Sequence, residues 1–101
     1  MPSSDQSIAL TAAAIALTTI ARRKLAQPET LAALLDQPDC RALGRLVTEL
    51  HAAGERDRAR GVLEQATRIR ELGGFSAVLE AASPHAREAW EAATWVARGE
   101  K

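Results

Sequence analysis

The chain has very few aromatic residues and a single cysteine. Aromatic residues make up 3% of its 101 residues, and tyrosine and asparagine are absent. A core with so few rings must be built from Leu, Ile, Val and Ala, which suits close packing of helices better than a β-sheet. The lone Cys40 excludes an intrachain disulfide and is typical of the reducing cytoplasm, where we expect the protein to reside.

The sequence also lacks an excess of charge of either sign. Thirteen lysines and arginines balance thirteen aspartates and glutamates, so the formal net charge is zero. A dedicated nucleic-acid-binding domain normally has a basic excess, and the balance argues against that class. A chain without net charge lacks the repulsion that keeps small proteins monomeric, and we expect a homo-oligomer. Arginine far outnumbers lysine, which indicates a GC-rich bacterial coding sequence.

Groups that carry catalysis or hold a metal are scarce. Cys40, His51 and His85 are scattered without metal-ligand spacing, and the sequence has no Gly-rich phosphate loop. Cys40 lies near the start of a predicted helix, where the helix dipole should lower its pKa. No histidine neighbours it in the sequence, and a buried, unreactive role is favoured. We therefore predict no catalytic residue, no metal site and no cofactor.

A membrane-spanning segment is not expected, although residues 8–21 are apolar. This run has fourteen residues, whereas a transmembrane helix needs about 20. The positive residues 22–24 follow the run, whereas in a signal peptide they precede it. As a helix the run is apolar on nearly all sides, which predicts burial against protein. One of its faces has mostly small residues and is predicted to mediate self-association: Ala9, Ala13, Ala16 and Ile20.

Helix start and stop signals divide the chain into about six helices. The predicted helices cover residues 5–26, 28–36, 39–53 and 55–72, a short helix around residues 75–79, and residues 84–98. No segment alternates with a period of two, so the fold class is all-α, a compact bundle of five to six helices. Residues 1–101 form a single domain, with residues 1–4 disordered and residues 99–101 frayed.

Residues 43–67, LGRLVTELHAAGERDRARGVLEQAT, have the pattern of a helical hairpin. Gly54 separates two amphipathic segments, and the small Ala59 and Ala66 let them approach. The stretch resembles a single tetratricopeptide (TPR) hairpin, although that family's helix-ending proline is Glu71 here and no second copy follows after about 34 residues. The resemblance implies an antiparallel hairpin and a peptide-binding role. The second segment is predicted to bury Ala59, Val62, Leu63, Ala66 and Ile69.

Two segments carry candidate partner-binding residues. Arg56, Arg58 and Arg60 form an arginine-rich region that can dock on an acidic protein surface. Trp90 and Trp95 should point about 140° apart on one helix, so that one locks the core and the other anchors an interface. Trp95, near the chain end, is favoured as the exposed one. We predict a small non-catalytic protein-interaction module, an adaptor or an inhibitor that occludes its partner.

Two alternatives remain open. The helices at 28–36 and 39–53 could form the helix-turn-helix of a dimeric DNA-binding regulator, with Arg41, Arg45 and Thr48 on the DNA. The turn between them lacks the usual glycine. A small single-domain chain also fits an inhibitor of a host or defence complex encoded by a phage or plasmid, as anti-CRISPR proteins are. This second alternative rests on size alone and on no particular residue.

Overall fold

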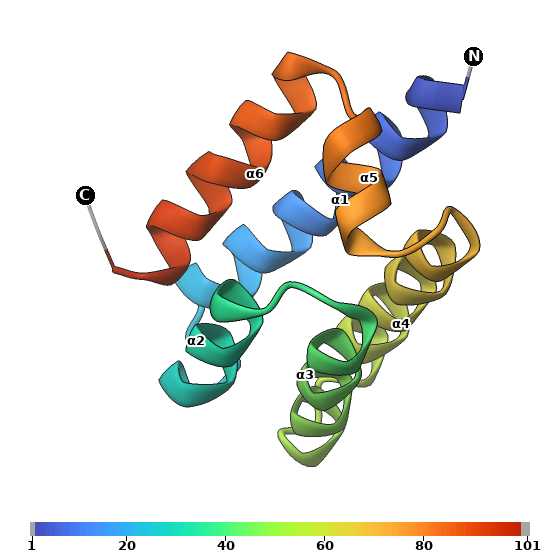
Figure 1. Cartoon of the computed structure of the whole chain (residues 1–101). Coiled ribbons are helices and arrows are strands. Elements are labelled where there is room, and N and C mark those ends of the chain that lie inside the picture. Colours follow the sequence, from blue (N-terminus) through green and yellow to red (C-terminus); the bar gives the residue numbers. More distant parts are fainter. Residues whose placement is uncertain (1, 100–101) are drawn as a thin grey trace.

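A computed structural model describes residues 2–99, which form six α-helices packed as one bundle (Figure 1). The described residues contain no strand, and the predicted all-α fold is confirmed. The helices are α1 (Pro2–Arg22), α2 (Pro28–Asp36), α3 (Cys40–Ala52), α4 (Arg56–Glu71), α5 (Phe75–Ala81) and α6 (Pro84–Ala97). The predicted disorder of residue 1 and fraying of residues 100–101 lie outside the described residues.

Most helix boundaries follow the capping signals. The side chain of Asp39 begins α3 by accepting a hydrogen bond from the Ala42 N–H at 2.7 Å. Ser83 begins α6 in the same way, and prolines occupy the first positions of α2 and α6. Gly54 follows α3 with a φ of 83°, a left-handed conformation that ends the helix as predicted.

Both ends of α1 differ from the prediction. The helix begins at Pro2, so residues 2–4 are helical instead of disordered, and it ends at Arg22 instead of residue 26. Lys24 adopts a left-handed φ of 53°, and the Leu25 N–H donates to the Ile20 carbonyl at 3.0 Å. These features define a Schellman turn, which stops the helix at a lysine where the sequence shows no glycine.

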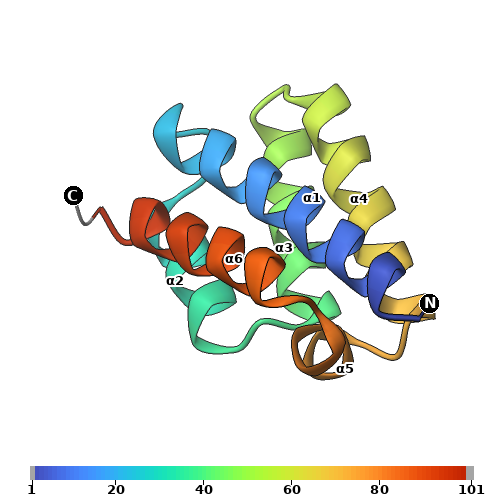
Figure 2. The same cartoon turned by 90° about the horizontal axis from the view of Figure 1, so that it is seen from above.

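Helices α1 and α6 lie side by side and run in the same direction (Figure 2). At the start of the pair, the Ser83 N–H donates to the Ser7 hydroxyl at 2.9 Å. At its end, Ala21 and Ala97 line one groove. On the other side of α1 lies α4, so that α1 is placed between α6 and α4, and α5 also packs against α1.

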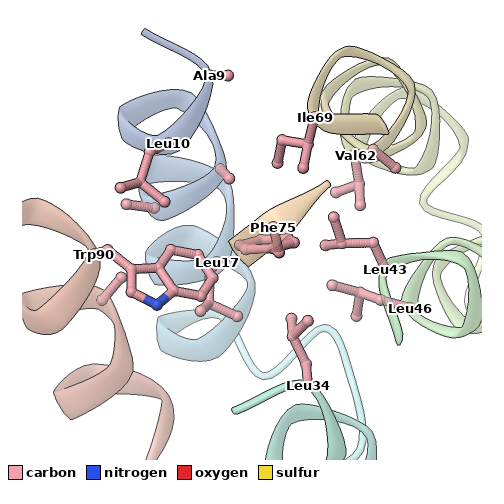
Figure 3. Close-up of a cluster of buried hydrophobic side chains, with 14 of the residues drawn as sticks. Ala9, Leu10, Leu17, Leu34, Leu43, Leu46, Val62, Ile69, Phe75 and Trp90 are labelled. Carbon is pink, nitrogen blue, oxygen red and sulfur yellow. The ribbon is translucent and has the colours of Figure 1, made fainter. Parts of the chain in front are cut away.

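The core is aliphatic apart from two rings (Figure 3). Phe75 of α5 and Trp90 of α6 pack with their ring centroids 5.2 Å apart and their planes inclined by 51°. Large aliphatic side chains from five helices fill the rest of the core: Leu10, Ile20, Leu34, Leu46, Leu50, Ile69 and Val78. One tryptophan therefore locks the core, as predicted.

The small-residue face of α1 is buried inside the chain itself. Ala9, Ala13 and Ile20 are at most 5% exposed, and the half-buried Ala16 lines a groove between α1 and α4. The prediction that these residues mediate self-association is therefore wrong. The small side chains instead allow the chain's own α4 to approach α1 closely.

The opposite face of α1 is open to solvent. Ile8 and Ile15 are each 64% exposed, which corrects the prediction that the helix is buried on nearly all sides. They lie seven residues apart and so share one side of the helix. Among the described residues, no helix has both the length and the apolar character needed to span a membrane.

Candidate interaction surfaces

Neither a metal-binding cluster nor an activated cysteine is found in the described part of the chain. Within residues 2–99, no group of three or more His, Cys, Asp and Glu side chains could hold a metal ion. The half-buried Cys40 thiol lies 3.6 Å from the Ala66 carbonyl. Burial and the charge of Asp39 raise the pKa of this thiol above 9.0, against a smaller lowering by Arg70. The expected lowering by the helix dipole is therefore wrong, and the thiol is protonated at neutral pH.

The two tryptophans have different roles. Trp90 is 7% exposed and packs on Phe75, so the prediction that it contacts a partner is wrong. Trp95 is 56% exposed, which confirms it as the outward one. On the outer side of α6 it aligns with the exposed Glu88 and Glu91, at spacings of three and four residues. We call Glu88, Glu91 and Trp95 the acidic ridge.

Helices α3 and α4 form an antiparallel hairpin (Figure 1). The Glu55 N–H closes its turn by donating to the Leu50 carbonyl at 2.9 Å. The contact between Cys40 and the Ala66 carbonyl ties the start of α3 to the second half of α4. The predicted hairpin is therefore confirmed, while the peptide-binding role implied by the TPR resemblance stays a prediction.

The hairpin presents exposed arginines on both of its helices. Arg41 and Arg45 are exposed on α3, and Thr48 continues their stripe. A second exposed stripe follows α4 at spacings of four and three residues, and the exposed Glu64 lies beside it, four residues after Arg60. We call the two stripes together the basic face, which comprises Arg41, Arg45, Thr48, Arg56, Arg60, Leu63, Thr67 and Arg70. Its five arginines form no ion pair within residues 2–99.

Ion pairs show which flank of α4 faces α1. Arg68 pairs with Asp5 of α1 at 3.4 Å. Arg58 pairs with Glu55 at 3.5 Å and lines the groove beside Ala16. Arg58 therefore lies apart from the basic face, on the α1 side of α4, and only two of the three predicted α4 arginines lie together on that face. Arg70 lies on the α3 side, because its charge acts on the Cys40 thiol.

Leu63 is a member of the basic face that the sequence misplaced. It is 50% exposed, so its predicted burial is wrong. The buried stripe of α4 is already filled by Ala59, Val62, Ala66 and Ile69, and position 63 falls outside it. These four residues follow one another at spacings of three and four and already form a full buried stripe. The spacing alone could therefore have predicted that Leu63 lies outside the buried stripe. Leu63 thus places an apolar side chain among the arginines.

Comparison of the chain with protein-family models, with curated proteins and with solved structures gives no match. The fold and its surface define the class of protein: an all-α bundle with a basic exposed face on one hairpin and an acidic ridge on another helix.

Proposed function

We propose that the protein is a non-catalytic interaction domain that binds an acidic partner protein through its basic face. One observation carries this proposal: five exposed arginines without intrachain ion pairs in the described residues accompany the exposed Leu63. Guanidinium groups bind carboxylates with two parallel hydrogen bonds, which is why arginine is enriched at protein interfaces. Leu63 adds an apolar contact within the charged surface.

The mode of action follows from the rigid setting of these side chains. They project from two packed helices, so binding requires little rearrangement of the backbone. The hairpin would cover a patch of the partner's surface as wide as the two helices. Such coverage suits an adaptor, and it also suits an inhibitor that blocks the covered surface. An inhibitor of a host or defence complex falls within this proposal, as does a location in the bacterial cytoplasm.

DNA binding is the second candidate function, because Arg41, Arg45 and Thr48 are exposed as that alternative requires. The width of the hairpin favours a protein partner instead. Two helices side by side present a surface about 20 Å wide, whereas the major groove of B-DNA is about 12 Å wide. With α4 beside it, α3 would contact phosphates more readily than base edges.

The test compares capture by the wild type with capture by Arg56→Glu/Arg60→Glu. A matched control, Arg23→Glu/Lys24→Glu, makes the same change in charge at the end of α1. We expect the wild type and the control to retain one acidic protein from a lysate of the source cell, and the first variant to lose it. The captured protein, once purified, should bind the wild type in isothermal titration calorimetry, and circular dichroism verifies that each variant is folded.

Two outcomes contradict the proposal. Capture that persists in Arg56→Glu/Arg60→Glu would show that another surface binds the partner. Binding to a short DNA duplex, measured by fluorescence anisotropy, with affinity falling steeply as salt rises, would replace the protein partner by DNA.

A further inference from the structure

The acidic ridge matches part of the basic face in both charge and spacing. Glu88, Glu91 and Trp95 span seven residues of α6, and Arg56, Arg60 and Leu63 span seven residues of α4. Seven residues of helix correspond to about 10 Å. Each set has two side chains of the same charge followed by one exposed apolar side chain. The charges of the α6 set are negative, and those of the α4 set are positive.

A parallel alignment of the two sets pairs all three positions. With Trp95 placed against Leu63, Glu88 falls at the level of Arg56. Glu91 then falls one residue from the level of Arg60, a difference of about 1.5 Å. In the opposite direction Glu91 would instead face Thr67, which carries no charge. The parallel alignment therefore forms one more ion pair.

Neither set forms an ion pair within residues 2–99, and Trp95 is more than half exposed. Two cations border the ridge without pairing with it. Arg22 of α1 lines a groove together with Glu88 and Trp95, and Arg87 lines another with Glu91. The Arg87 guanidinium is engaged by the carbonyls of Leu79 and Glu80 at the end of α5, to which it donates at 3.0 and 2.6 Å.

The fold keeps the two surfaces apart in a single chain. Helix α6 lies on one side of α1, and the α3–α4 hairpin lies on the other (Figures 1 and 2). We propose that the basic face of one copy binds the acidic ridge of a second copy, so that the protein assembles head to tail. After one contact each of the two copies still has one unused surface, so that further copies add and produce open chains or a closed ring. Because the net charge is zero, electrostatic repulsion between copies opposes the assembly only weakly.

This inference rests on the proposed function, because it identifies a second copy of the chain as one acidic partner of the basic face. The acidic partner and the second copy would then compete for the same arginines. Dilution of the protein would free the basic face, and excess partner would separate the copies.

Analytical ultracentrifugation over a range of protein concentrations tests the assembly. We expect the average mass of the wild type to rise beyond a dimer with concentration and to fall with added salt. Trp95→Ala, Glu88→Arg/Glu91→Arg and Arg56→Glu/Arg60→Glu should each weaken association at least about tenfold. Two matched controls, Glu71→Arg/Glu80→Arg and Arg23→Glu/Lys24→Glu, should associate like the wild type.

Mixing two impaired variants separates this contact from a symmetric one. Glu88→Arg/Glu91→Arg retains the basic face, and Arg56→Glu/Arg60→Glu retains the acidic ridge. An equimolar mixture should therefore associate although neither variant does alone. A mixture that stays monomeric overturns the proposal.

The outcomes also distinguish this proposal from the proposed function. A wild type that remains monomeric at every concentration refutes the assembly, while loss of partner capture by Arg56→Glu/Arg60→Glu would still support the interaction domain. Association that Ile8→Ser/Ile15→Ser abolishes and the ridge variants leave intact would assign the contact to α1 and refute the ridge.

Discussion

Lys24 ends α1 in a backbone conformation that glycine adopts at the ends of two other helices. Gly54 and Gly73 follow α3 and α4 with φ values of 83° and 106°. All three turns have the same pattern of backbone hydrogen bonds. The N–H of the left-handed residue donates to the carbonyl three residues earlier, and the next N–H donates to the carbonyl five residues before it. An L-residue pays a steric cost of about 1 kcal/mol or more in this conformation, because its Cβ approaches the following carbonyl. Lys24 is therefore a strained position.

Replacement of Lys24 by glycine should stabilise the protein. We expect Lys24→Gly to raise the free energy of unfolding by about 1 kcal/mol, and the Tm by about 4–8 °C. Gly54→Ala should lower stability by a similar amount through the backbone alone, because a Cβ at Gly54 meets nothing within 4 Å. Thermal and urea unfolding measure both effects. A Lys24→Gly variant less stable than the wild type would refute the strain.

The two tryptophans provide a matched pair of substitutions on one helix. Trp90→Ala should cost about 3–5 kcal/mol of stability, because it removes a buried ring that packs on Phe75. Trp95→Ala should change stability by less than about 0.5 kcal/mol, because its ring is largely exposed. Urea unfolding measures both values, and equal losses would contradict the different burial of the two side chains.

The Cys40 thiol should titrate above the ordinary value of 9.0, because burial and Asp39 raise its pKa. The folded chain therefore holds this proton more tightly than the unfolded chain does. The resulting stabilisation is complete below pH 9.0 and is lost as the pH rises through the folded-state pKa. The rate of alkylation by iodoacetamide against pH should have its midpoint above 9.0. A midpoint below 9.0 would instead indicate an activated thiol.

At the scale of the helices, local signals in the sequence predict most of the boundaries. The prolines at positions 28 and 84, the Asp39 cap and Gly54 fix the limits of α2, α3 and α6 to within one residue of the prediction. The end of α1 could not be predicted in this way, because Lys24 has no intrinsic preference for a left-handed conformation. Pro2 is itself a start signal, but Ser3, Ser4 and Asp5 suggested a later cap.

The candidate surfaces could be predicted only in part. The sequence identified the arginines of α3 and α4, and helical spacing predicted that the two tryptophans diverge, while the place of Trp95 near the chain end favoured it as the exposed one. It could not decide whether Ala9 and Ala13 face a helix of the same chain or of another copy, because small residues suit both. The approach of Arg70 on α4 to Cys40 at the start of α3 depends on the packing of α3 against α4, which no local pattern specifies.

Helix α2 begins with a cap that comes from another helix. The Gln27 side chain does not cap it. Instead, the Glu49 carboxylate of α3 accepts hydrogen bonds from the Gln27 N–H and the Thr30 hydroxyl. We expect Glu49→Ala to lower the free energy of unfolding by about 1–2 kcal/mol. Glu64→Ala, a control at an exposed position of α4, should change the free energy of unfolding little. Urea unfolding measures both variants, and an equal loss of stability in the two would contradict the capping role of Glu49.

At the scale of the molecule, segments close to the two ends of the described chain form one layer. Ser7 contacts Ser83, a separation of 76 residues, and Ala21 shares a groove with Ala97, also 76 residues further on (97 − 21). Helices α2, α4 and α5 pack against this pair, and α3 packs against α4 and α2. The pair therefore holds the bundle together across nearly its whole length.

Removal of α6 tests the importance of this layer. A chain truncated after residue 82 loses Trp90, which lies beside Leu10 and Leu17 (Figure 3) and is the partner ring of Phe75. We expect it to lose cooperative thermal unfolding, measured by circular dichroism. A cooperative transition at the wild-type temperature would show that α1–α5 are stable by themselves.

The distance in sequence between α1 and α6 also affects how the protein is made. On the ribosome, α1 is synthesised before α6, and the side of α1 that packs on α6 remains uncovered until the fourteen residues of α6 have emerged. Closure of so long a loop delays completion of the bundle until α6 has been synthesised. During that interval the nascent chain exposes aliphatic surface of the kind that chaperones bind.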